Sequence, residues 1–154
     1  MAQADNSVFT GFFEHTLDDK GRLTIPSAWR HAPTEEGGAG VAFLATPHPD
    51  GYIAVLPPAE VTKLREKVSA QKLGDSSAQA FLARFFSRTQ GFTIDKAGRT
   101  LLTPDLLKHA GIERDAVLVG SLTKFNIYSP ARWKQEEART AGENYGDVMR
   151  RLDI

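Results

Sequence analysis

The same short sequence pattern occurs twice in this chain, and this internal repeat restricts the fold more than any other feature. Residues 16–22 read TLDDKGR and residues 93–99 read TIDKAGR, with the two glycines 77 residues apart. Further matches follow in the same order in both halves, at 41–45 with 116–120 and at 52–57 with 125–130. The repeat therefore predicts two copies of one folding unit.

Each copy reads as strand, glycine turn, strand, short helix, strand, turn and strand. Residues 13–17 and 23–25 are apolar-rich segments on either side of a polar turn, which is typical of a hairpin or a sharp loop. A helix is predicted to begin at Pro104, because Thr103 can cap its first turn and proline is favoured at the first helical position.

A helical connector is predicted between the two copies. Apolar residues recur at helical spacing in its first part, at Val61, Leu64 and Val68, and Gly74 interrupts the pattern. A second apolar stripe follows, made of Phe81, Leu82, Phe85 and Phe86.

The expected fold class is mainly β with short helices (α+β). One unit of this size buries few residues, so the two halves are expected to complete each other's core in one intertwined body. The predicted division is a first copy at 9–57, the connector at 58–90, a second copy at 91–134, and a helix end and tail at 135–154. Residues 1–8 and the tail after Gly142 are expected to be frayed.

Composition excludes several classes of function. The chain of 154 residues has no cysteine, so disulfides, thiolate metal sites and cysteine nucleophiles are excluded. No apolar run is long enough to cross a membrane and the first residues do not resemble a signal peptide, so a cytoplasmic protein is expected. The four histidines occur singly, and no zinc, Walker or dinucleotide motif is present. We therefore expect no cofactor, no metal, no small-molecule substrate and no enzymatic activity.

The repeated turns carry the candidate site. In such a turn, aspartate can accept hydrogen bonds from backbone amides, glycine can adopt a positive φ, and arginine begins the next strand. The candidate residues are Asp18, Lys20, Gly21 and Arg22 in the first copy and Asp95, Lys96, Gly98 and Arg99 in the second.

Two interpretations of these turns remain open from the residues, and both can hold at once. In the first, aspartate and arginine bridge each other and only hold the turn. In the second, Arg22 and Arg99 project toward DNA, because the planar guanidinium can make paired hydrogen bonds to phosphate or to guanine. Nineteen basic residues balance nineteen acidic ones, so binding to DNA requires a local cationic surface repeated in space. The basic residues of the connector are interpreted as solvated helix faces.

The sequence of residues 13–26, FEHTLDDKGRLTIP, resembles the signature of MraZ, a bacterial family of transcriptional regulators built from two AbrB-like units. Residues 95–99, 101–102 and 109–111 are similar to the second repeat of that family, and 85–87 and 129–133 add further matches. The resemblance covers residues 12–134.

This resemblance implies a swapped-hairpin, AbrB-like fold that forms a pseudo-symmetric, barrel-like body and assembles into an octamer-like ring. It also implies a nucleoid-associated repressor that binds double-stranded DNA at direct repeats in the promoter of its own division and cell-wall gene cluster. The DNA-contacting positions would be 18–22 and 95–99, with Asp18 and Asp95 orienting the arginines.

The second copy departs from the family pattern at two positions. Ala97 stands at the place of Lys20, and Thr103 stands where the first copy has a proline, so the second turn is expected to bind DNA more weakly.

The residues leave two other classes of function open. The first is an AbrB-like antitoxin that binds a toxin protein, but such antitoxins usually have one repeat and an acidic tail, whereas this chain has two repeats. The second is a barrel-fold hydrolase that uses paired aspartates. Asp18 and Asp19 are adjacent, so on a strand they would point to opposite faces.

Overall fold

The computed structural model describes residues 7–30, 43–71 and 74–154. Residues 1–6, in the expected frayed start, and residues 41–42, in one of the matched segments, lie outside the described ranges. The strands are β1 (Phe12–Thr16), β2 (Arg22–Thr24), β3 (Phe43–His48), β4 (Tyr52–Leu56), β5 (Gln90–Phe92), β6 (Arg99–Leu101), β7 (Asp115–Gly120) and β8 (Phe125–Tyr128). The helices are η1 (Ser27–Trp29, a 3-10 turn), α1 (Pro58–Ser69), α2 (Ser76–Ser87), α3 (Pro104–His109), α4 (Pro130–Thr140) and α5 (Tyr145–Leu152).

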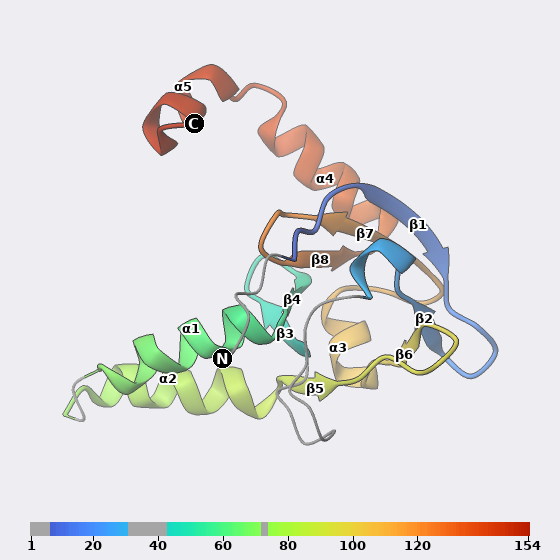
Figure 1. Cartoon of the computed structure of the whole chain (residues 1–154), viewed down its shortest axis with the longest axis horizontal. Helices are drawn as coiled ribbons and strands as arrows, with labels where there is room; N and C mark the ends of the chain where they lie inside the picture. The colour runs from blue at the N-terminus through green and yellow to red at the C-terminus, as the bar shows by residue number, and fades with distance from the viewer. Residues whose placement is uncertain (1–6, 31–42, 72–73) are drawn as a thin grey trace.

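Six strands form an antiparallel sheet in the order β1-β7-β8-β4-β3-β5 (Figure 1). In the repeat, β1 is equivalent to β5, β3 to β7 and β4 to β8. Exchanging each strand for its equivalent gives the same order, read from the other end of the sheet. The first strand of each copy pairs with the other copy, β1 with β7 and β5 with β3. The two copies are therefore interleaved around a pseudo-twofold axis, and the predicted α+β, intertwined fold is confirmed.

The remaining strands, β2 and β6, form a separate two-stranded antiparallel ribbon. Within the described ranges β1 and β5 stay the two edges of the larger sheet, so the strands do not close into a complete barrel. The expectation of a barrel-like body is thus corrected to an open sheet with a ribbon packed beside it.

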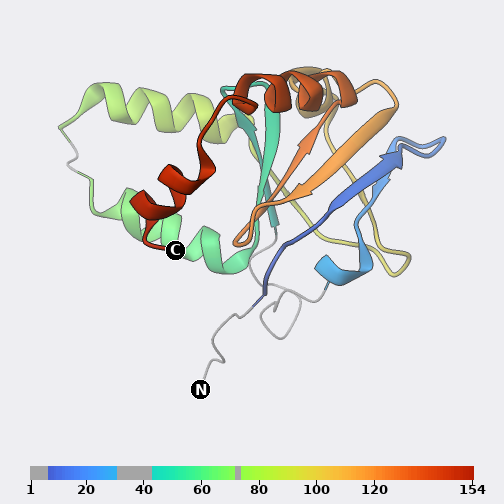
Figure 2. The ribbon, with the colours of Figure 1, turned by 90° about the horizontal axis from the view of Figure 1, so that it is seen from above.

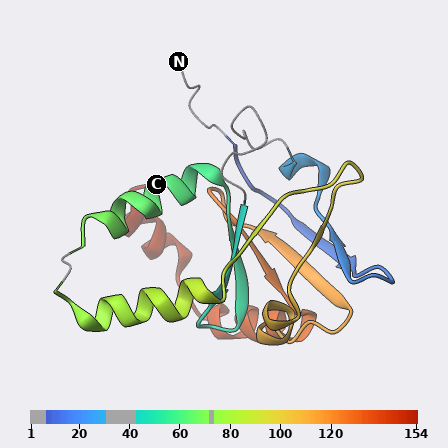
Figure 3. The same ribbon diagram turned by 90° about the horizontal axis from the view of Figure 1, so that it is seen from below.

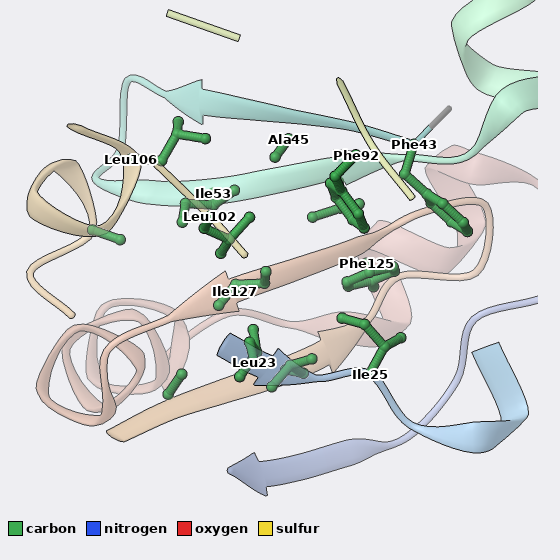
Figure 4. Close-up of a cluster of buried hydrophobic side chains, with 14 of the residues drawn as sticks. Leu23, Ile25, Phe43, Ala45, Ile53, Phe92, Leu102, Leu106, Phe125 and Ile127 are labelled. Atoms are coloured by element: carbon green, nitrogen blue, oxygen red, sulfur yellow. The ribbon is translucent and has the colours of Figure 1, made fainter. Parts of the chain in front are cut away.

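The core lies between the ribbon and the inner face of the six-stranded sheet. Figure 4 shows Leu23 and Ile25 from the ribbon side facing Phe125 and Ile127 of β8. Trp29 of η1 stacks on Phe125 with ring centroids 4.7 Å apart. Each of these side chains is buried, which stabilises the fold by about 1.5–3 kcal/mol per large apolar side chain. The ribbon is therefore fixed to the sheet by its inward-facing residues.

Local signals set the helix boundaries. The hydroxyl of Thr103 accepts a hydrogen bond from the amide of Leu106 at 3.3 Å, and Pro104 is the first residue of α3, as predicted. Helices α1 and α2 extend together from one side of the sheet (Figures 2 and 3). None of the helices in the described ranges has the length and apolar character needed to span a bilayer.

The expected fraying after Gly142 is wrong for most of that segment. Asn144 caps α5 by accepting a hydrogen bond from the amide of Asp147 at 3.2 Å, and the helix continues to Leu152. The predicted division of the chain into two copies, a connector and a tail stays a prediction.

Candidate nucleic-acid interface

Pairing of β2 with β6 brings the two predicted turns to one place. Leu23 lies opposite Thr100 at the centre of the ribbon, and both side chains are buried. Side chains alternate between the two faces of a strand, so the neighbouring residues Arg22 and Arg99 point to the outer face. The two arginines lie diagonally across the pseudo-twofold axis, on the same exposed surface.

The first turn is held by its own aspartate. Asp18 Oδ1 accepts hydrogen bonds from the amides of Lys20 at 3.0 Å and Arg22 at 2.8 Å. The amide of Gly21 donates to the carbonyl of Asp18 at 2.8 Å, and Gly21 has a φ of +78°. Glycine adopts this left-handed conformation without steric cost, which explains its place in the repeat.

The second turn repeats the first almost bond for bond. Asp95 Oδ1 accepts from the amides of Ala97 and Arg99, both at 2.9 Å. The amide of Gly98 donates to the carbonyl of Asp95 at 2.9 Å, with a φ of +82°. Because Ala97 takes part only through its backbone amide, its difference from Lys20 does not alter the turn.

The aspartates also hold the arginine side chains. Arg22 Nε lies 2.7 Å from Asp18 Oδ2, and Arg99 Nε lies 3.3 Å from Asp95 Oδ2. Arg99 Nη1 is in addition 3.9 Å from Asp18 Oδ2, so Asp18 is near both guanidinium groups. The two arginine side chains remain 28% and 33% exposed. Aspartate and arginine therefore bridge each other in both turns, and the arginines nevertheless face solvent.

Both turn carboxylates are held in the charged form. The backbone hydrogen bond from Arg22 is the main cause that lowers the pKa of Asp18, and the bond from Arg99 does the same for the pKa of Asp95. Partial loss of hydration opposes both shifts without reversing them. A carboxylate of this kind is a hydrogen-bond acceptor and is poorly suited to act as a general acid at neutral pH.

A third arginine, which the sequence did not indicate, lies against the second turn. Arg30 Nε donates to the carbonyl of Ile25 at 2.6 Å. Its guanidinium covers Gly98 so closely that a Cβ atom at position 98 would lie 2.1 Å from Arg30 Cζ. At Gly21 the corresponding atom would meet only Leu101 Cδ1, at 3.8 Å. The two turns therefore differ in their surroundings although their backbones match.

No pattern in the sequence could have pointed to Arg30. A shift of 77 residues aligns it with Leu107, so it lies outside the repeated features. The positive charge of Arg30 also acts on His15. The pKa of His15 is lowered mainly by partial burial and to a smaller extent by repulsion from Arg30.

Basic side chains outnumber acidic ones in the two turns. Lys20 and Lys96 are exposed on the two turns. Together with the three arginines they make five cations beside three carboxylates, which are Asp18, Asp19 and Asp95. Figure 1 shows α1 on the side of the molecule away from β2 and β6, so the basic residues of α1 lie apart from this surface. Among the described residues, no three His, Cys, Asp or Glu side chains are grouped so that they could hold a metal ion.

The chain is similar in sequence to known proteins of one family. Residues 85–152 match the family model of the "MraZ protein", further described as "antitoxin-like". Over 145 residues the chain is 34% identical to "Transcriptional regulator MraZ" of Heliobacterium modesticaldum, covering 94% of this chain and 96% of that protein. It is 36% identical to the protein of the same name from Symbiobacterium thermophilum, covering 92% and 98%. The corresponding protein of Desulfitobacterium hafniense is also 36% identical, over 94% of this chain and 96% of its own length. This chain belongs to the MraZ family.

Proposed function

We propose that this protein is a sequence-specific DNA-binding transcriptional regulator that represses its own division and cell-wall gene cluster. It binds direct repeats in the promoter through Arg22 and Arg99, as a ring-shaped homo-oligomer on the nucleoid in the cytoplasm. The observation that supports this proposal is the pairing of β2 with β6, because it puts both arginine turns on one exposed face. The relatives named transcriptional regulators support the same class of function.

The aspartate of each turn holds the arginine side chain of that turn in one orientation. In each turn a carboxylate oxygen engages Nε, which fixes the plane of the guanidinium. Among the described residues Arg22 has no other hydrogen-bond acceptor, so its terminal nitrogens are available for a ligand. A guanidinium held in this way can bind a phosphate or the O6 and N7 atoms of guanine, and little side-chain conformational entropy is lost on binding.

A two-stranded β-ribbon is also a type of element that can contact DNA. The major groove of B-form DNA is about 12 Å wide and admits a two-stranded β-ribbon. The ribbon formed by β2 and β6 presents its arginines on the face opposite the core, flanked by Lys20 and Lys96 on the turns. In the proposed complex the arginines contact base edges and the lysines contact the phosphates on either side.

Assembly compensates for the neutral charge of one chain. A subunit with equal numbers of acidic and basic residues gains little from general attraction to DNA. Several linked copies that meet evenly spaced repeats gain avidity of about 10²–10⁴ through effective concentration. The proposal therefore requires several DNA repeats and predicts weak retention of a single one.

A gel-shift assay with the region upstream of the protein's own gene tests this function. We expect Arg22→Ala to abolish retention of the DNA while leaving the chromatographic mass of the oligomer unchanged. Arg65→Ala is the matched control, because Arg65 is an exposed arginine of α1, far from the ribbon. Unchanged retention with Arg22→Ala would remove Arg22 from the site.

A second candidate function follows from the "antitoxin-like" description of the family model. An AbrB-like antitoxin would bind a toxin protein as its main task. If the purified protein showed no preference for its upstream DNA over an unrelated fragment and instead protected cells from a co-expressed toxin, this candidate would replace the repressor.

A further inference from the structure

The outer face of the ribbon departs from the pseudo-twofold symmetry that relates its two strands. Exchange of the two copies places Arg22 on Arg99. The same exchange places Leu101, which pairs with Arg22, on Thr24. A face with exact twofold symmetry would bind a DNA sequence equally well in both directions. Direct repeats have one direction, so a subunit that binds them needs a difference between the two ends of its contact surface.

Leu101 is an apolar residue on this polar face. It is 56% exposed and lies directly opposite Arg22 in the ribbon. Its backbone is held by Gln90, whose side-chain amide donates to the carbonyl of Leu101 at 2.7 Å and accepts from the amide of Thr103 at 2.8 Å. The leucine methyl groups are therefore presented to solvent beside a guanidinium. Contact with an apolar group of a ligand would remove this surface from water, which is favourable.

Arg30 distinguishes the other end of the face. A Cβ atom added at Gly21 would lie 3.8 Å from Leu101 Cδ1, so the open side of that glycine belongs to the outer face. The two turns have the same backbone geometry, and the corresponding side of Gly98 is the one that the Arg30 guanidinium covers. The counterpart of Arg30 in the second copy is Leu107, which packs against the core. One end of the face therefore offers an apolar group, and the other end offers an additional guanidinium.

We propose that Leu101 determines the specificity and the direction of DNA binding by contacting the C5-methyl group of a thymine. This methyl group lies in the major groove, where apolar side chains contact it. Because Leu101 and Arg22 are neighbours across the ribbon, the thymine lies next to the base that Arg22 contacts. The opposite end of the ribbon carries Thr24 and Arg30 and cannot make the same contact. This inference rests on the proposed function, for which it names the group on the DNA that is recognised.

Replacement of thymine by uracil tests the contact, because uracil lacks only the C5-methyl group. Each thymine of one repeat in the upstream region is replaced in turn, and affinity is measured by fluorescence anisotropy. We expect one position to lower the affinity of the unchanged protein about fourfold, which corresponds to the loss of one buried methyl group. Leu101→Ser should bind the original and the substituted DNA equally, whereas Leu101→Ile should still distinguish them.

Thr24→Ser is the matched control, because it removes a methyl group from the equivalent position of the other strand. It should leave the sensitivity at that thymine unchanged. The direction of binding is mapped with an iron chelate attached to position 97 of the variant Ala97→Cys, since the native chain has no cysteine. Cleavage of the DNA should fall on one side of each repeat, the side away from the sensitive thymine.

Four outcomes would overturn this inference and leave the proposed function intact. The first is normal retention of the original DNA with no loss of affinity at any thymine, and the second is sensitivity that persists in Leu101→Ser. The third is a changed chromatographic mass of Leu101→Ser, because Leu101 would then lie between subunits. The fourth is equal cleavage on both sides of a repeat. If the unchanged protein does not retain its upstream DNA, the proposed function is overturned and this inference with it.

Discussion

Replacing each turn glycine by alanine should have unequal effects on stability. Gly21 and Gly98 both have positive φ, so either substitution forces alanine into a left-handed conformation that costs about 1–2 kcal/mol. At position 21 the added methyl group meets only Leu101 in ordinary contact, so no further cost is expected. Gly21→Ala should therefore lower the free energy of unfolding by about 1–2 kcal/mol.

Gly98→Ala carries a second cost. The added methyl group would overlap the guanidinium of Arg30, which must move away. Arg30 then loses the hydrogen bond from its Nε to the carbonyl of Ile25. The guanidinium is the far end of a flexible, partly exposed side chain and can bond to water instead, so this loss should add about 0.5–1.5 kcal/mol and bring the total to about 1.5–3.5 kcal/mol.

Urea unfolding at one fixed protomer concentration measures both effects. Substituting Arg30→Ala in each glycine variant completes the comparison, because removal of the guanidinium removes the overlap. In that background the two glycine substitutions should cost the same within about 0.5 kcal/mol. Equal losses for Gly21→Ala and Gly98→Ala in the presence of Arg30 would refute the placement of Arg30 over the second turn.

Three further outcomes follow from the same geometry. Asp18→Asn keeps an oxygen for the two backbone amides but removes the charge beside both arginines. Affinity for the upstream DNA should therefore fall about tenfold in fluorescence anisotropy. The lowered pKa values of Asp18 and Asp95 give stability that is complete above their ordinary pKa of 3.8 and is lost as the pH falls through the lower folded values. Acid unfolding should therefore lose part of its steepness in Asp18→Asn, and an unchanged acid transition would contradict this reasoning. Affinity for DNA should fall steeply with salt, and Lys20→Ala should reduce the slope of log affinity against log salt by about one per site; an unchanged slope would show that Lys20 does not contact phosphate.

The repeat in the sequence was sufficient to predict the twin turns but not their meeting in space. Aspartate, glycine and arginine at fixed spacing determine local hydrogen bonds, and these form as the pattern predicts. Strands β2 and β6 have three residues each and are 77 residues apart, so their pairing depends on the whole sheet and not on local preference. The shared arginine face could therefore be described only from the structure.

Two other features were missed for different reasons. Arg30 acts through a long side chain that reaches across to the other copy, and a linear pattern carries no information about such a contact. The sequence does indicate helix α5, because Asn144 is a favoured cap residue and the apolar residues between Tyr145 and Leu152 recur at helical spacing. The general tendency of chain ends to fray does not apply here, because the cap and the helical spacing are both present.

The central claim is that Arg22 and Arg99 form one composite contact with DNA. Affinities of the unchanged protein, Arg22→Ala, Arg99→Ala and the double variant, measured by fluorescence anisotropy at one salt concentration, test it as a double-mutant cycle. A shared contact predicts that the double variant loses less affinity than the sum of the single losses, with a coupling of about 1 kcal/mol or more. Losses that add without coupling, or a double variant that binds like the unchanged protein, would contradict the account.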